Sequence, residues 1–117
     1  MAVNIVPVGS DRKLLDRFLK LPYDVYGDDP HVVFPLLGEQ KKFFDHSVNP
    51  FFEHAETELW LATRDGRTVG RIAACIDATS NAHHQEQVGF FGFYEVFDDA
   101  EAAGALLAVA AEWIRAR

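Results

Sequence analysis

The fold is decided by two runs of sequence, ELWLATRDGRTVGRIAACI at residues 58–76 and VGFFGFYEV at residues 88–96. Within the first run, Asp65 and Gly66 form a pair that is typical of a type I′ turn, because both central residues of that turn need a positive φ. The apolar residues on either side of this pair favour strands. Residues 58–76 are therefore predicted to form a β-hairpin, and residues 88–96 a further strand.

The second run is dominated by aromatic side chains. Strict alternation would place one group of side chains on one face (Val88, Phe90, Tyr94, Val96) and a second group on the other (Phe91, Phe93, Phe97). Because both groups are apolar, we expect helices to cover both faces of this strand. Gly92 has two open interpretations: it makes room for a neighbouring aromatic ring, or it marks a bulge or the close approach of a ligand.

The flanking segments predict helices. Asp98 or Asp99 is expected to cap a helix that runs to the last residue and lays its apolar stripe on the sheet. Near the N-terminus, residues 3–8 suit a short edge strand, followed by a helix that Ser10 or Asp11 caps and that Leu21-Pro22 interrupts.

The middle of the chain is predicted to be less regular. We expect a short helix over residues 36–44, with Phe51-Phe52 inserted into the core and residues 77–87 forming an exposed, mobile loop. Together these elements predict an α/β chain of the α+β type, with a mostly antiparallel sheet of about four strands and helices on both faces. The whole chain, residues 1–117, is expected to be one domain.

Composition limits the classes of function. The net charge of −7 opposes contact with phosphate backbones, so we expect no nucleic-acid partner. No apolar run approaches the roughly 20 residues that cross a bilayer, so we expect no membrane partner. A single cysteine, Cys75, and an N-terminus unlike a signal peptide favour a cytoplasmic location. His83 and His84, near Glu86 and Asp77, lack the spacing of a metal site, so no metal is expected.

Several segments resemble the N-terminal half of the GNAT acyltransferase fold and, more narrowly, a bacterial family of GNAT-like proteins. They are LPYDVYGDDPHVVFPLL (residues 21–37), NPFFEHA (49–55), GRIAA (70–74) and GFFGFYE (89–95). The resemblance implies an acyl-CoA, such as acetyl-CoA, as acyl donor and a small-molecule amine as acceptor. It also implies that pantetheine binds along the aromatic strand, at Phe93 and Val96.

The resemblance further implies a pyrophosphate cradle at the start of the last helix, over Asp98, Asp99 and the residues up to Ala103. Ala103 matches the family's motif. Asp98 stands where a basic or amide residue belongs, and Glu101 replaces a glycine. Carboxylates at these positions oppose phosphate, which is a departure from the family pattern.

For catalysis, Glu95 is the candidate general base, and the alternative is a sheet-edge glutamate paired with an arginine such as Arg71. Tyr94 is the candidate general acid for the leaving thiolate, and the alternative is a core aromatic residue with a bonded hydroxyl. Three functions stay open: an N-acyltransferase or its half-domain, a non-catalytic GNAT-like binding module, and an assembly unit. We expect a homodimer through the aromatic strand edge.

Overall fold

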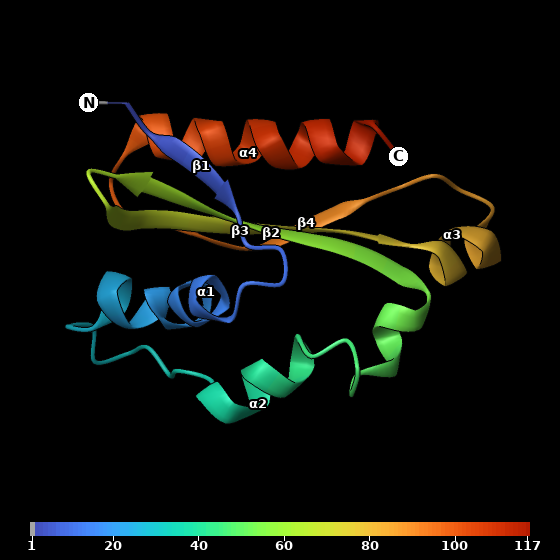
Figure 1. The fold of residues 1–117 in the computed structure, drawn as a ribbon, viewed down its shortest axis with the longest axis horizontal. Coiled ribbons are helices and arrows are strands. Elements are labelled where there is room, and N and C mark those ends of the chain that lie inside the picture. The colour runs from blue at the N-terminus through green and yellow to red at the C-terminus, as the bar shows by residue number, and fades with distance from the viewer. Residues whose placement is uncertain (1) are drawn as a thin grey trace.

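The computed structural model describes residues 2–117 and contains one four-stranded antiparallel sheet in the order β1-β2-β3-β4. Helix α4 covers one face of this sheet, and α1 with α2 lies on the other (Figure 1). The α+β fold with helices on both faces is therefore confirmed. The elements are β1 (Asn4–Pro7), α1 (Arg12–Tyr26), α2 (Leu37–Phe43), η1 (Pro50–Glu53), β2 (Ala55–Arg64), β3 (Arg67–Asp77), α3 (Ala78–His84), β4 (Phe90–Val96) and α4 (Ala100–Arg115).

The hairpin forms as predicted. Asp65 and Gly66 have φ values of 54° and 80°, which are the positive angles that a type I′ turn needs. Arg64 and Arg67 are the first paired residues on either side of the turn, and the pairing continues to Ala55 and Asp77. The two longest strands thus form the centre of the sheet.

Each face of the sheet has its own apolar core. Toward α4, the buried side chains come from β2, β3 and α4, including Trp60, Ile72 and Leu106. Toward α1, they come from α1, β2, β3 and the residue that follows β1, and they include Phe18, Leu61 and Val8. This division follows from the alternation of side chains along β2. None of the helices in residues 2–117 has the length and apolarity to span a membrane.

Helix α1 differs from the prediction, because Pro22 does not interrupt it. Asp11 caps the helix by accepting hydrogen bonds from the backbone N–H groups of Lys13 (2.9 Å) and Leu14 (3.2 Å). The helix then continues through Pro22 to Tyr26. A proline inside a helix deprives the carbonyl four residues earlier of its partner. Here that carbonyl belongs to Phe18, and it accepts a hydrogen bond from the side chain of Arg71 in β3 instead.

Two expectations for the middle of the chain are wrong. Residues 77–87 are not a continuous loop, because Asp77 caps the helix α3 through the N–H groups of Thr79 and Ser80. Phe51 and Phe52 are not inserted into the core. They belong to the short helix η1, where neither is buried and Phe51 is 40% exposed.

Strand β4 carries a bulge that the alternation pattern did not predict. Arg71 pairs with Glu95 and Ala73 with Gly92, so one extra β4 residue lies between these pairs. Phe93, in this interval, has a φ of 51°. Gly92 lies beside the bulge, and a Cβ there would meet nothing within 4 Å, so it does not make room for a ring.

The bulge and the edge position change which side chains are covered. Tyr94 and Val96 pack toward α4, whereas Phe93 contacts Phe18 of α1. Phe90 and Phe91 are 53% and 56% exposed, so the expectation that helices cover both faces along the whole strand is wrong at its first two residues. The physical reason is that α4 packs over the later residues Tyr94 and Val96 and leaves the start of this edge strand uncovered.

Candidate functional site

An aromatic hollow of about 210 Å³ opens beside the first half of β4. Its side walls are phenylalanines from three separate segments, and its floor is the end of the β2–β3 pair. The wall residues are Phe43, Phe44, Phe51, Phe52, Phe90, Phe91 and Phe93, and the floor residues are Thr57, Leu59 and Ala73 to Cys75, with Gly92 at the bulge. A site of this composition favours an apolar ligand over a charged one.

Phe93 is the residue that joins this hollow to the interior. Its ring lies 5.1 Å from the ring of Phe44 and 6.3 Å from that of Phe18, both measured between centroids. A phenylalanine with a positive φ is strained, and such strain persists only where the surroundings hold it. The bulge therefore holds this side chain between the hollow and the polar groups behind it.

Arg71 of β3 is the first of those polar groups. It is only 5% exposed, and its guanidinium lies over the rings of Phe18 (4.9 Å) and Phe93 (5.6 Å). Its Nη1 donates to the Phe18 carbonyl at 2.7 Å. Within residues 2–117, Nε of Arg71 is the one buried side-chain polar atom without a hydrogen-bond partner. Burial lowers the pKa of Arg71, and the nearby Glu95 carboxylate partly opposes this effect.

Glu95 lies opposite Arg71 in the β3–β4 pairing. Its Oε2 accepts a hydrogen bond from the hydroxyl of Tyr26, the last residue of α1. This hydrogen bond raises the pKa of Tyr26, and burial and the charge of Glu95 raise it further. Arg71, Glu95 and Tyr26 thus form a polar cluster that connects β3, β4 and α1.

The two residues predicted to be catalytic are not brought together. Glu95 belongs to the polar cluster on the α1 side, whereas the Tyr94 hydroxyl donates to the Ala103 carbonyl of α4 at 3.0 Å. They therefore lie on opposite faces of β4. Val96 also packs toward α4, where its side chain lies beside Gly70.

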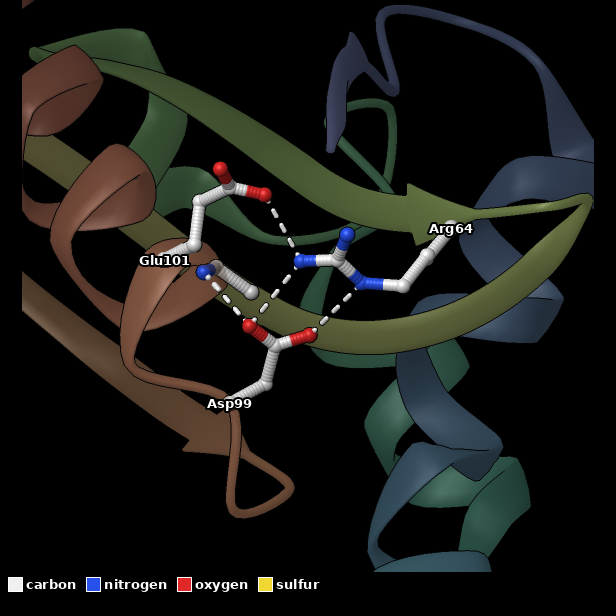
Figure 2. Close-up of polar contacts among 4 residues, drawn as sticks. Arg64, Asp99 and Glu101 are labelled. Carbon is white, nitrogen blue, oxygen red and sulfur yellow. Dashed lines mark hydrogen bonds and ion pairs between the residues drawn. The ribbon is translucent and has the colours of Figure 1, made fainter. Parts of the chain in front are cut away.

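Two acidic residues at the start of α4, Asp99 and Glu101, accept hydrogen bonds from the side chain of Arg64 (Figure 2). Arg64 donates through Nε and Nη2 to the two carboxylate oxygens of Asp99, at 3.0 and 3.1 Å. Its Nη2 also donates to Glu101 at 2.7 Å. The hydrogen bonds from Arg64 lower the pKa of Asp99, and the hydrogen bond from the Ala102 N–H lowers it further. The carboxylates of this turn are therefore paired within the chain, while Asp98 stays exposed.

This geometry bears on the expected pyrophosphate cradle. The N–H of Ala102 donates to the Asp99 side chain, and the N–H of Ala103 donates to the Asp99 carbonyl. Both N–H groups already have acceptors within the chain. A phosphate there would also lie against the carboxylates of Asp99 and Glu101. The residues at the start of α4 therefore do not fit a pyrophosphate group.

The histidines of residues 2–117 do not form part of a metal-ligand cluster. His83 and His84 are neighbours on α3, with ring centroids 4.9 Å apart. Across residues 2–117, no group of three or more histidine, cysteine or acidic side chains is placed to hold a metal ion.

Sequence reasoning missed Tyr26 entirely. Tyr26 and Glu95 are 69 residues apart, and no local motif connects a helix-terminal tyrosine to a strand glutamate. The alternative of a glutamate beside Arg71 did identify the facing arginine, because residues 71 and 95 lie in strands predicted to be neighbours.

Comparison with known proteins identifies two relatives. The chain is 38% identical over 116 residues to a protein named bacterial ceramide synthase from Caulobacter vibrioides, and 31% identical over 103 residues to Protein YghO from Escherichia coli. These matches cover 98% and 88% of this chain, but the chain spans only 30% and 26% of the relatives' own lengths. No family model matches the chain. No solved structure matches it significantly.

Proposed function

We propose that this chain is the acyl-binding part of a GNAT-related N-acyltransferase, which moves an acyl group from a thioester to an amine. The observation that carries the proposal is the aromatic hollow, which adjoins through Phe93 the polar cluster containing Glu95. The name of the Caulobacter relative supports it. A ceramide is an amide of a fatty acyl group, so its synthesis forms the same type of bond.

The hollow is proposed to hold the acyl chain. Burial of apolar surface contributes roughly 25 cal/mol per Å², so a chain of several methylenes gains more from these walls than an acetyl group does. The volume of about 210 Å³ lies below the roughly 300 Å³ of the smallest typical ligand pockets, so the acyl end alone enters it. We therefore propose a longer acyl group as the preferred substrate, rather than acetyl.

The proposed chemistry is direct attack. The amine nitrogen forms a bond to the thioester carbonyl carbon, the carbon–sulfur bond breaks, and the amine proton passes to the Glu95 carboxylate. The departing thiolate takes a proton from water, because the Tyr94 hydroxyl is bonded to Ala103 on the other face of β4. The alternative assignment of Tyr94 as the acid requires that bond to break first.

Coenzyme A is the expected thiol carrier, and the cytoplasm is the expected compartment. Because the start of α4 does not fit a pyrophosphate, no role in binding the carrier's phosphates is assigned to Asp98, Asp99 or Ala103. The proposal instead rests on recognition of the acyl end, with Phe93 at the inner wall of the hollow.

Two measurements test this function. The first incubates the chain with acetyl-, octanoyl- and palmitoyl-CoA and a long-chain amino alcohol, and detects the amide by mass spectrometry. The second uses Cys75, the only cysteine of the chain, which lines the hollow. Octanoyl-CoA should slow its alkylation by a maleimide, acetyl-CoA should do so much less, and a Cys75→Ser variant should show no labelling. Absence of both amide and protection would refute the proposal.

A second candidate function is assembly through β4. This strand is the sheet edge, and Phe90 and Phe91 are each more than half exposed there. Exposed apolar edges favour pairing with another copy, so a homodimer is proposed. Light scattering after size-exclusion chromatography tests it: a mass of one chain at high concentration would exclude the dimer, and Phe91→Ser should shift a dimer toward monomer.

A further inference from the structure

Tyr26 reaches the proposed general base from α1, a helix to which the proposed chemistry gives no other role. Its hydroxyl donates to one oxygen of the Glu95 carboxylate, Oε2. Tyr26 is half-buried and is the last residue of α1. Its position is therefore set by how α1 docks on the sheet.

The docking of α1 depends on Arg71. The hydrogen bond from Arg71 to the Phe18 carbonyl ties α1 to β3 two turns before Tyr26. Arg71 also lies opposite Glu95 in the strand pairing. The same buried arginine thus fixes the helix that carries Tyr26 and faces the strand residue that Tyr26 bonds.

The second oxygen of Glu95 is available. Among residues 2–117, no group donates to Oε1, and this atom is not one of the sealed polar atoms without a partner. It follows that Oε1 is not fully sealed from solvent. One oxygen is held by a phenol while the other can accept a proton, which is the arrangement that a general base requires.

Two groups from other elements interact with Glu95. They are the Tyr26 hydroxyl, from α1, and the Arg71 guanidinium, from β3. One donates a hydrogen bond and the other carries a positive charge, so both interact favourably with a carboxylate.

We propose that Tyr26 is a positioning residue for Glu95, holding Oε2 so that Oε1 accepts the proton of the incoming amine. This role rests on the proposed function, because it has meaning only if amide synthesis occurs. It differs from a structural role in one respect: the hydroxyl acts on the carboxylate, while the aromatic ring alone would suffice for packing.

The test compares Tyr26→Phe with Tyr23→Phe in the full chain, using octanoyl-CoA and a long-chain amino alcohol. Tyr23 is the matched control, since it lies one turn earlier on α1 and donates to the Pro35 carbonyl instead. Tyr26→Phe should lower kcat about tenfold, a part of the ~10²–10⁴-fold that a positioned proton acceptor contributes. The KM for the acyl thioester should not change, and Tyr23→Phe should behave as the unmodified chain does.

The split between kcat and KM separates positioning from packing. Disturbed packing of α1 would change both constants, whereas loss of the phenol alone should lower kcat and leave the KM for the acyl thioester unchanged. An unchanged kcat in Tyr26→Phe, with an active parent, would overturn the proposal.

An independent readout follows the phenol itself. The chain has three tyrosines, and their ring carbons can be followed by NMR as the pH is raised. The resonance absent in Tyr26→Phe belongs to Tyr26 and should titrate above the ordinary tyrosine pKa of 10.0, and Glu95→Gln should lower that pKa. Failure of that shift would overturn the pairing even if amide forms. A normal shift in a chain that makes no amide would refute the proposed function and, with it, the role of Tyr26.

Discussion

Arg71 donates a hydrogen bond to the Phe18 carbonyl, with 2.7 Å between Nη1 and the oxygen, and so replaces the N–H that Pro22 lacks. This relationship explains why α1 continues through a proline. It also explains why an arginine lies buried on the apolar face of β3, since the carbonyl supplies a partner that the surrounding side chains do not. One hydrogen bond thus gives the Phe18 carbonyl a donor and the buried Arg71 guanidinium an acceptor.

Removal of the Arg71 guanidinium should therefore destabilise the fold. Arg71→Met leaves the Phe18 carbonyl without a partner, and loss of a hydrogen bond to a charged group costs about 1.5–3 kcal/mol. Pro22→Ala restores an N–H that can bond the same carbonyl. In that background, Arg71→Met should cost at least about 0.5 kcal/mol less, which is the coupling expected between residues that share a partner. Urea denaturation of the four proteins measures the coupling, and strict additivity would contradict it.

Asp99 should make the stability depend on acid pH. Arg64 holds the pKa of this carboxyl below its ordinary value of 3.8 in the folded chain. The stabilisation is therefore present above pH 3.8 and is lost as the pH falls through the lower folded value. Asp99→Asn keeps an N-cap but removes the charge, so it should reduce the loss of stability between neutral and acid pH. Urea denaturation at neutral and acid pH measures this loss, and a loss in Asp99→Asn as large as in the unmodified chain would contradict this account.

Tyr26 should have the opposite effect at alkaline pH. Its hydrogen bond to Glu95 raises its pKa above the ordinary value of 10.0. The stabilisation is complete below pH 10.0 and is lost as the pH rises through the higher folded value. Urea denaturation at mildly and strongly alkaline pH should show a smaller decline for Tyr26→Phe than for the unmodified chain. An equal decline in both proteins would argue against the pairing.

Two glycines near β4 should respond differently to the same substitution. A Cβ on Gly89 would lie 2.6 Å from Cγ2 of Ile114 and 2.7 Å from Cδ1 of Ile76, so Gly89→Ala should cost about 1–3 kcal/mol through overpacking. A Cβ on Gly92 would meet nothing within 4 Å. Gly92→Ala should therefore be neutral or stabilise slightly, because alanine loses less backbone entropy on folding. Thermal unfolding of the two variants gives the comparison, and equal effects would contradict this account.

The local features of the fold could be predicted from neighbouring residues. The Asp65-Gly66 turn depends on the backbone angles that two adjacent residues tolerate. The caps at Asp11 and Asp99 likewise depend on a side chain and N–H groups at most three residues away. Each of these interactions forms within one segment, so composition and spacing were sufficient.

The candidate site was decided by contacts between distant segments. The bulge at Phe93 exists only in the pairing of β4 with β3, and it moves the aromatic side chains out of strict alternation. Whether Pro22 ends α1 depends on Arg71, and the partner of Glu95 is Tyr26, 69 residues away. A hydrogen bond of this kind forms only after packing brings both elements together, and no local preference of either segment encodes it.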